Sequence, residues 1–142
     1  MSPDESNGFF AGHVADLLRS YHELTGKHLV EPCGSPAEEA RAAYAARFVL
    51  LSHGMEEDPL LNYGNLSGQK LFAMPWGQLV GTPSRFTAEA PNRREREMLL
   101  KRVAGEGFID DYSGIRIAAD GRRFLIRDAT VWNVVDKSGK KV

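Results

Sequence analysis

A long β-hairpin in the C-terminal third constrains the fold of this chain most strongly. Two β-rich runs, residues 108–118 and 123–135, flank the pair Asp120-Gly121. Asp-Gly between two such runs is one of the stronger local signals for a tight hairpin turn. Both faces of the second run mix polar and apolar residues, so the alternation does not decide which face is inward. We therefore expect an antiparallel sheet built around this hairpin.

Short strands and helices are predicted before the hairpin. Residues 48–54 and 60–64 are apolar runs bounded by glycine or proline, typical of two short antiparallel strands. Glycine and proline then interrupt the pattern over residues 65–84, which favours short helical turns. Residues 91–103 predict a charged amphipathic helix with Met98, Leu99 and Val103 inward and Gly105 just past its end. Its mixed charges indicate a solvated face rather than a phosphate site.

The N-terminal third predicts two helices. Apolar residues recur at spacings of three and four over residues 9–25, and Gly26 is a plausible helix end. Ser35 followed by Pro36 and two glutamates is typical of a helix start, here of a helix reaching about residue 46. We expect an N-terminal helical extension over residues 1–47 on a core of residues 48–142, forming one structural unit.

Composition excludes several function classes. The chain has 142 residues, 42% of them hydrophobic, and a formal net charge of -1, which suits one domain and provides no field to attract nucleic acid. No apolar run approaches the ~20 residues of a membrane helix, and the first residues lack signal-peptide features. The only cysteine is Cys33. We expect a cytoplasmic protein with a reduced thiol and neither nucleic-acid nor membrane partners.

The order of these elements resembles that of PAS domains. Five strings together resemble the MEKHLA domain, a PAS-related family found in small bacterial proteins and at the end of plant class III homeodomain leucine-zipper proteins. They are Leu51-Ser52-His53-Gly54, Asn62-Tyr63-Gly64-Asn65, Pro83-Ser84-Arg85, Gly107-Phe108-Ile109-Asp110-Asp111-Tyr112-Ser113-Gly114 and Ala129-Thr130-Val131-Trp132-Asn133. The resemblance runs from about Phe10 to Val142. It implies an α+β fold, a PAS-like antiparallel sheet with short helices on one face, and a sensing or interaction role with no assured ligand. We expect the partner to be a second copy of the chain, forming a homodimer, or another signalling protein.

The resemblance also implies a gap in the sheet. In the PAS fold the last strand lies in the middle of the sheet beside the first, and this sequence stops where that strand should begin. Such a gap leaves two unpaired strand edges. The strand is expected to be truncated, supplied in trans, or replaced by the N-terminal segment. We favour the first two because residues 9–25 predict a helix.

Two cofactors of the wider superfamily are disfavoured by the residues present. The flavin-binding light sensors resemble residues 81–86 but have Asn-Cys where this chain has Pro83-Ser84, so cysteine-adduct photochemistry is excluded and only non-covalent flavin binding stays open. Heme-binding PAS domains commonly ligate from the long helix, and residues 93–104 contain no histidine. The cofactor, if any, is unknown.

Candidate ligand-binding residues share a place near the expected cavity between the sheet and the short helices. They are His53, Asn62, Tyr63, Asn65, Phe72, Trp76, Ser84, Arg85 and Trp132. Structural roles compete for most of them: a helix cap for Asn65, core packing for Tyr63, a turn or helix cap for Ser84, and a surface position for Arg85. The aromatic residues either line a pocket or fill it.

Three functions stay open from the sequence. The first is a sensory or interaction module that binds a small ligand; the second is a dimerisation or partner-docking domain with a filled core. The third is a small α+β enzyme using His53 and an aspartate, although no nucleophile, base and orienting group converge. We expect Asp110, Asp111 and Asp128 to pair with arginines across the hairpin instead.

Overall fold

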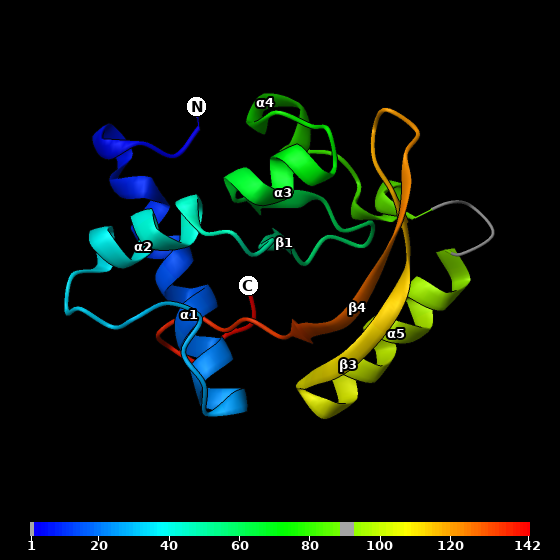
Figure 1. Ribbon diagram of the computed structural model, residues 1–142. Coiled ribbons are helices and arrows are strands. Elements are labelled where there is room, and N and C mark those ends of the chain that lie inside the picture. Colours follow the sequence, from blue (N-terminus) through cyan, green and yellow to red (C-terminus); the bar gives the residue numbers. More distant parts are fainter. Residues whose placement is uncertain (1, 89–92) are drawn as a thin grey trace.

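The computed structural model describes residues 2–88 and 93–142, shown in Figure 1. Its helices are η1 (Glu5–Phe10), α1 (Ala11–Thr25), α2 (Pro36–Ala45), α3 (Leu66–Leu71), α4 (Trp76–Leu79), η2 (Ser84–Thr87) and α5 (Arg93–Glu106). Its strands are β1 (Leu51–His53), β2 (Leu61–Gly64), β3 (Phe108–Ile117) and β4 (Arg123–Trp132). The expected mixture of short strands and helices in the α+β class is confirmed.

The N-terminal helices begin and end where the sequence predicts. Gly26, with φ 76°, ends α1 in a left-handed conformation that glycine adopts without strain. The Ser35 side chain accepts a hydrogen bond from the Glu38 backbone and so caps α2. The one difference lies at the start, where Phe9 and Phe10 belong to the irregular turn η1 before α1.

Helix α5 extends beyond its predicted end, and one of its three predicted inward residues points outward. Gly105 lies inside it, and Gly107, with φ 89°, follows its last residue. Leu99 and Val103 are buried as expected, but Met98 is 64% exposed, so its inward placement was wrong. Leu99 and Val103 are four residues apart and share one face of the helix, whereas Met98, directly before Leu99, points about 100° away from that face. Residues 91 and 92 lie outside the described part of the chain.

The strands form two separate antiparallel hairpins. β1 pairs with β2 and β3 pairs with β4, and within the described residues no strand bridges the two pairs. Lys141 forms an isolated bridge with Val135, and the Val142 backbone donates to the Val134 carbonyl. In Figure 1 the chain end accordingly lies between β1 and β4. Within the described residues β1 and β4 are therefore not paired with each other, and the N-terminal segment is helical rather than a strand between them.

One hydrophobic cluster joins the N-terminal helices to the rest of the chain. Val14 and Leu17 of α1 pack with Tyr63 of β2 and Trp76 of α4. Trp132 of β4 packs against the same cluster, and its indole N–H donates to the Leu17 carbonyl at 3.2 Å. The extension predicted over residues 1–47 thus contributes directly to the core.

The buried side chain of Asn65 is hydrogen-bonded at both its oxygen and its nitrogen. It is 0% exposed, and its Oδ1 accepts from the backbone N–H groups of Leu50 and Gly68, both at 3.0 Å. Its Nδ2 donates to the carbonyls of Ala43 at 3.0 Å and Phe48 at 2.8 Å. The amide therefore caps α3 and ties it to the end of α2 and to the segment that enters β1.

Replacing this amide tests how far the fold depends on it. Asn65→Ala leaves four backbone groups without their partner, and each buried unsatisfied group costs about 1–3 kcal/mol. We expect the free energy of unfolding, measured by urea denaturation, to fall by roughly 3 kcal/mol or more. The control is Asn62→Ala at an exposed position of β2, with an expected loss of under about 1 kcal/mol. Similar losses in both variants would contradict this role.

Candidate functional site

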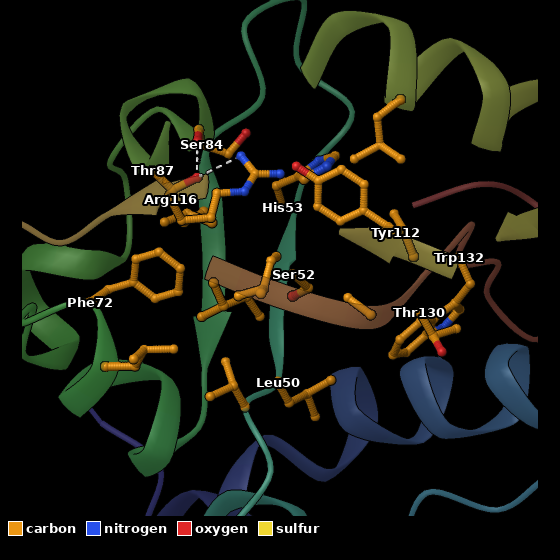
Figure 2. Close-up of a pocket in the computed structure, with 18 of the residues that line it drawn as sticks. Leu50, Ser52, His53, Phe72, Ser84, Thr87, Tyr112, Arg116, Thr130 and Trp132 are labelled. Atoms are coloured by element: carbon orange, nitrogen blue, oxygen red, sulfur yellow. Dashed lines mark hydrogen bonds between the residues drawn. The ribbon is translucent and has the colours of Figure 1, made fainter. Parts of the chain in front are cut away.

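A cavity of about 420 Å³ lies between the two hairpins. Leu50, Leu51 and Ser52 line it from the first hairpin, and Ile126 and Ala129 line it from β4. Phe72 after α3, η2 and the Leu99–Leu100 turn of α5 contribute further walls. Figure 2 shows these side chains pointing from separate elements into one space.

Irregular pairing in the second hairpin shapes the cavity wall. Tyr112 and Gly114 pair with Ala129 and Ile126, so three steps along β4 match two along β3, and Asp128 between them has φ 50°. Such an extra residue reverses the alternation of side chains along the bulged strand. Ile126 and Ala129 therefore both line the cavity although they are three residues apart.

A polar group occupies one end of the cavity. Arg116 of β3 is only 8% exposed, and its Nη1 lies 3.5 Å from Thr87 Oγ1. Its guanidinium lies 5.3 Å from the centre of the Tyr112 ring. The Thr87 hydroxyl donates to the Ser84 carbonyl at 2.7 Å, which leaves its oxygen free to accept from arginine. Figure 2 shows Arg116 beside Ser84 and Thr87, with Leu50 toward the opposite end.

A short hydrogen-bonded chain connects α1 with the first hairpin. His13 Nε2 lies 2.9 Å from Ser52 Oγ, and this hydroxyl donates to Asn62 Oδ1. Because the Ser52 proton goes to Asn62, His13 donates from Nε2. Burial lowers the pKa of His13 below its ordinary value, with a smaller opposing effect from Asp16. The chain is therefore built around a neutral imidazole.

The structure brings four of the predicted site residues to the cavity. They are His53, Phe72, Ser84 and Trp132. The other five lie elsewhere: Asn62 is exposed on β2, Tyr63, Asn65 and Trp76 are in the core, and Arg85 is at the surface. Arg85 pairs with Asp58 at 3.2 Å. Asn65 has the helix-capping role that competed with ligand binding.

The aspartates of the second hairpin are arranged differently from the prediction. Asp111 pairs with Arg102 of α5 at 3.4 Å rather than with an arginine across the hairpin. Asp110 and Asp128 are exposed, and none of the three lines the cavity. Helix α5 packs beside β3, and this packing places the Arg102 guanidinium next to the Asp111 carboxylate. Within residues 2–88 and 93–142, no three His, Cys, Asp or Glu side chains gather as a metal site would require.

Sequence reasoning missed Arg116, Thr87 and Tyr112 at the cavity. A signal for Arg116 was present, because the tight turn at Asp120-Gly121 sets the register that pairs Arg116 with Phe124. Paired residues share a face, and Phe124 packs on Phe72 with ring centres 5.2 Å apart. The turn therefore predicts that Arg116 and Phe124 share a face, and the contact with Phe72 shows that this face is inward.

Comparisons with known proteins agree with this architecture. A family model described as the MEKHLA domain matches residues 11–142. None of the curated protein sequences matches the chain. No helix among the described residues is both long and apolar enough to cross a membrane.

Solved structures with a similar fold are PAS and light-oxygen-voltage domains. The PAS domain of a protein from Colwellia psychrerythraea has a TM-score of 0.62 at 13% identity, over 74% of this chain and 86% of that one. An RNA-binding light-oxygen-voltage receptor has a TM-score of 0.64 at 18% identity, over 80% of this chain and 33% of that one. A PAS domain in complex with ethanol, from a LuxR-family transcriptional regulator of Burkholderia thailandensis, has a TM-score of 0.50 at 21% identity, over 69% of this chain and 96% of that one. At sequence identities this low, the similarity to these structures shows a shared fold only.

Replacing Tyr63 with Phe tests whether the Tyr63 hydroxyl contributes to the stability of the fold. It is buried with no hydrogen-bond partner among the described residues, and burial raises the pKa of the hydroxyl. Tyr63→Phe removes an unsatisfied polar atom, so we expect the free energy of unfolding to stay constant or rise by about 1 kcal/mol. The matched control is Tyr44→Phe, because the Tyr44 hydroxyl accepts from Gln69 Nε2 at 3.0 Å. That variant should lose about 1 kcal/mol. A loss at Tyr63 as large as that at Tyr44 would show that its hydroxyl is bonded.

The neutral His13 predicts a pH-dependent stability. Its pKa in the folded protein lies below the ordinary value of 6.5, so between the two values the unfolded chain binds more protons. Stability from this residue is therefore complete above about pH 6.5 and is lost as the pH falls through the folded pKa. In urea denaturation over a pH series, the wild type should lose more stability on acidification than His13→Gln. Parallel pH curves for the two proteins would rule out this effect.

Proposed function

Because this chain belongs to the MEKHLA domain family and has a PAS-like fold, we propose that it is a sensory module that binds a small molecule between its two hairpins. The observation that carries the proposal is the cavity of about 420 Å³. Small-molecule sites commonly have volumes of roughly 300–1,000 Å³, with apolar walls and a few placed polar groups. This cavity has such walls and such a volume.

The candidate ligand contacts are the predicted residues that lie at the cavity. Phe72 and Trp132 offer aromatic surface, while His53 and Ser84 offer polar atoms. A binding role is supported over catalysis because Asp110, Asp111 and Asp128, the aspartates considered as acid or base, lie away from His53 and outside the cavity. The His53 ring is also engaged, with Nδ1 3.0 Å from the Gly54 carbonyl.

Docking of a partner is a second candidate function, supported by the gap between β1 and β4. A groove there is lined by residues 51–55, by residues 130–134 and by Lys141 and Val142, whose backbone already pairs with part of the β4 side. Unpaired strand edges accept extended segments from other chains. The partner would be a second copy of this chain or another signalling protein.

The exposed Cys33 is compatible with either function in the cytoplasm, where thiols stay reduced.

A cavity-filling substitution tests the primary proposal. Native mass spectrometry of the purified protein should show a bound small molecule, or a thermal-shift screen of small fragments should raise Tm. Ala129→Leu fills part of the cavity and should abolish that binding while the protein stays folded. The matched control, Ala104→Leu, makes the same change at an exposed position of α5 and should retain it.

The same measurement separates the two candidates. A dimer with no bound molecule and no fragment that raises Tm would refute the sensory proposal in favour of docking. A monomer that binds a molecule, with binding lost only in Ala129→Leu, would refute docking as the main function.

A further inference from the structure

Among the residues that the structure describes, the least exposed arginine, Arg116, has no carboxylate partner. The arginines that form ion pairs, Arg19, Arg41, Arg85, Arg102 and Arg122, all have more exposed side chains. Arg116 is 8% exposed, yet within the described residues no Asp or Glu oxygen lies within 4.0 Å of it. A buried charge is costly unless it is paired and hydrogen-bonded.

The protein contacts of Arg116 satisfy only part of the guanidinium. This group has five N–H donors in a rigid fork. Among the residues that the structure describes, its partners are the Thr87 hydroxyl at 3.5 Å, near the limit of a hydrogen bond, and the face of Tyr112 at 5.3 Å. Neither of them is negatively charged. The arginine therefore lines the cavity, and within the described part of the chain most of its N–H donors have no protein acceptor.

The surroundings of Arg116 narrow the chemistry of that acceptor. Apart from this polar end, the cavity is lined largely by apolar side chains such as Leu50, Phe72 and Ile126. The other arginine at the cavity, Arg127, is exposed, so water already solvates its charge. One buried cation matches one negative charge, and the planar fork matches a carboxylate in a bidentate pair. A phosphate would bring more charge than this end can neutralise.

We propose that the cavity binds a small carboxylic acid, with its carboxylate on Arg116 and its apolar body along the wall formed by Leu50, Phe72 and Ile126. This inference rests on the proposed small-molecule function and adds the ligand class. The geometry supports it directly, because Figure 2 places Arg116 at one end of the cavity and Leu50 toward the other. The acid therefore has a defined orientation, with the charge next to Ser84 and Thr87.

A pair of probes of equal shape tests the charge requirement. 3-Phenylpropanoate and its neutral amide, 3-phenylpropanamide, are titrated into the wild-type protein by calorimetry at neutral pH. A hydrogen-bonded charge pair in a partly desolvated site should favour the acid by about tenfold or more. Equal affinity for acid and amide would overturn the carboxylate inference while leaving the small-molecule proposal intact. Binding of neither probe would overturn the inference for the cavity described here.

Substitution of Arg116 tests whether this residue supplies the positive charge that binds the carboxylate. Arg116→Gln should reduce acid affinity to that of the amide, a loss of about tenfold, with amide affinity unchanged within about twofold. The matched control, Arg47→Gln, removes one exposed positive charge that does not line the cavity and should retain the preference for the acid. If Arg127→Gln abolished the preference and Arg116→Gln did not, the anion would sit at the rim and the proposal would fail. The wild-type comparison decides the charge requirement even if a variant does not fold.

Discussion

The buried amide of Asn65 is the interaction on which the arrangement of the cavity depends. It binds four backbone groups from three separate segments, and its own backbone N–H donates to the Leu50 carbonyl at 3.0 Å. Leu50, whose backbone N–H and carbonyl both form hydrogen bonds with Asn65, also lines the cavity. One side chain therefore fixes where β1 starts relative to α3 and α2. An apolar residue could fill the same volume but could not satisfy these groups.

Much of the fold follows from local signals in the sequence. Gly26, Ser35 and Asp120-Gly121 act through short-range backbone chemistry, and the structure has the helix end, the helix start and the hairpin turn that they predict. These features are predictable because each depends on a few neighbouring residues.

The cavity was harder to predict because its walls depend on pairing irregularities. Alternation along β4 cannot be followed past Asp128, where φ is 50° and an extra residue reverses the two faces. The mixture of polar and apolar residues on both faces of this strand is explained by that reversal and by α5 and α1 lying against different parts of the hairpin. Aromatic residues were assigned to the site by type, yet Tyr63 and Trp76 fill the core while Phe72 and Trp132 reach the cavity. Sequence alone does not distinguish filling from lining.

The groove between β1 and β4 and the neighbouring cavity share part of their walls. Six residues line both: Leu51, Ser52, His53, Thr130, Val131 and Trp132. An extended segment in the groove and a molecule in the cavity would contact the same side chains. Their binding free energies would then be coupled, and by thermodynamic linkage each occupant would change the affinity for the other by the same factor. A chemical signal could in this way alter an assembly without any long-range rearrangement of the chain.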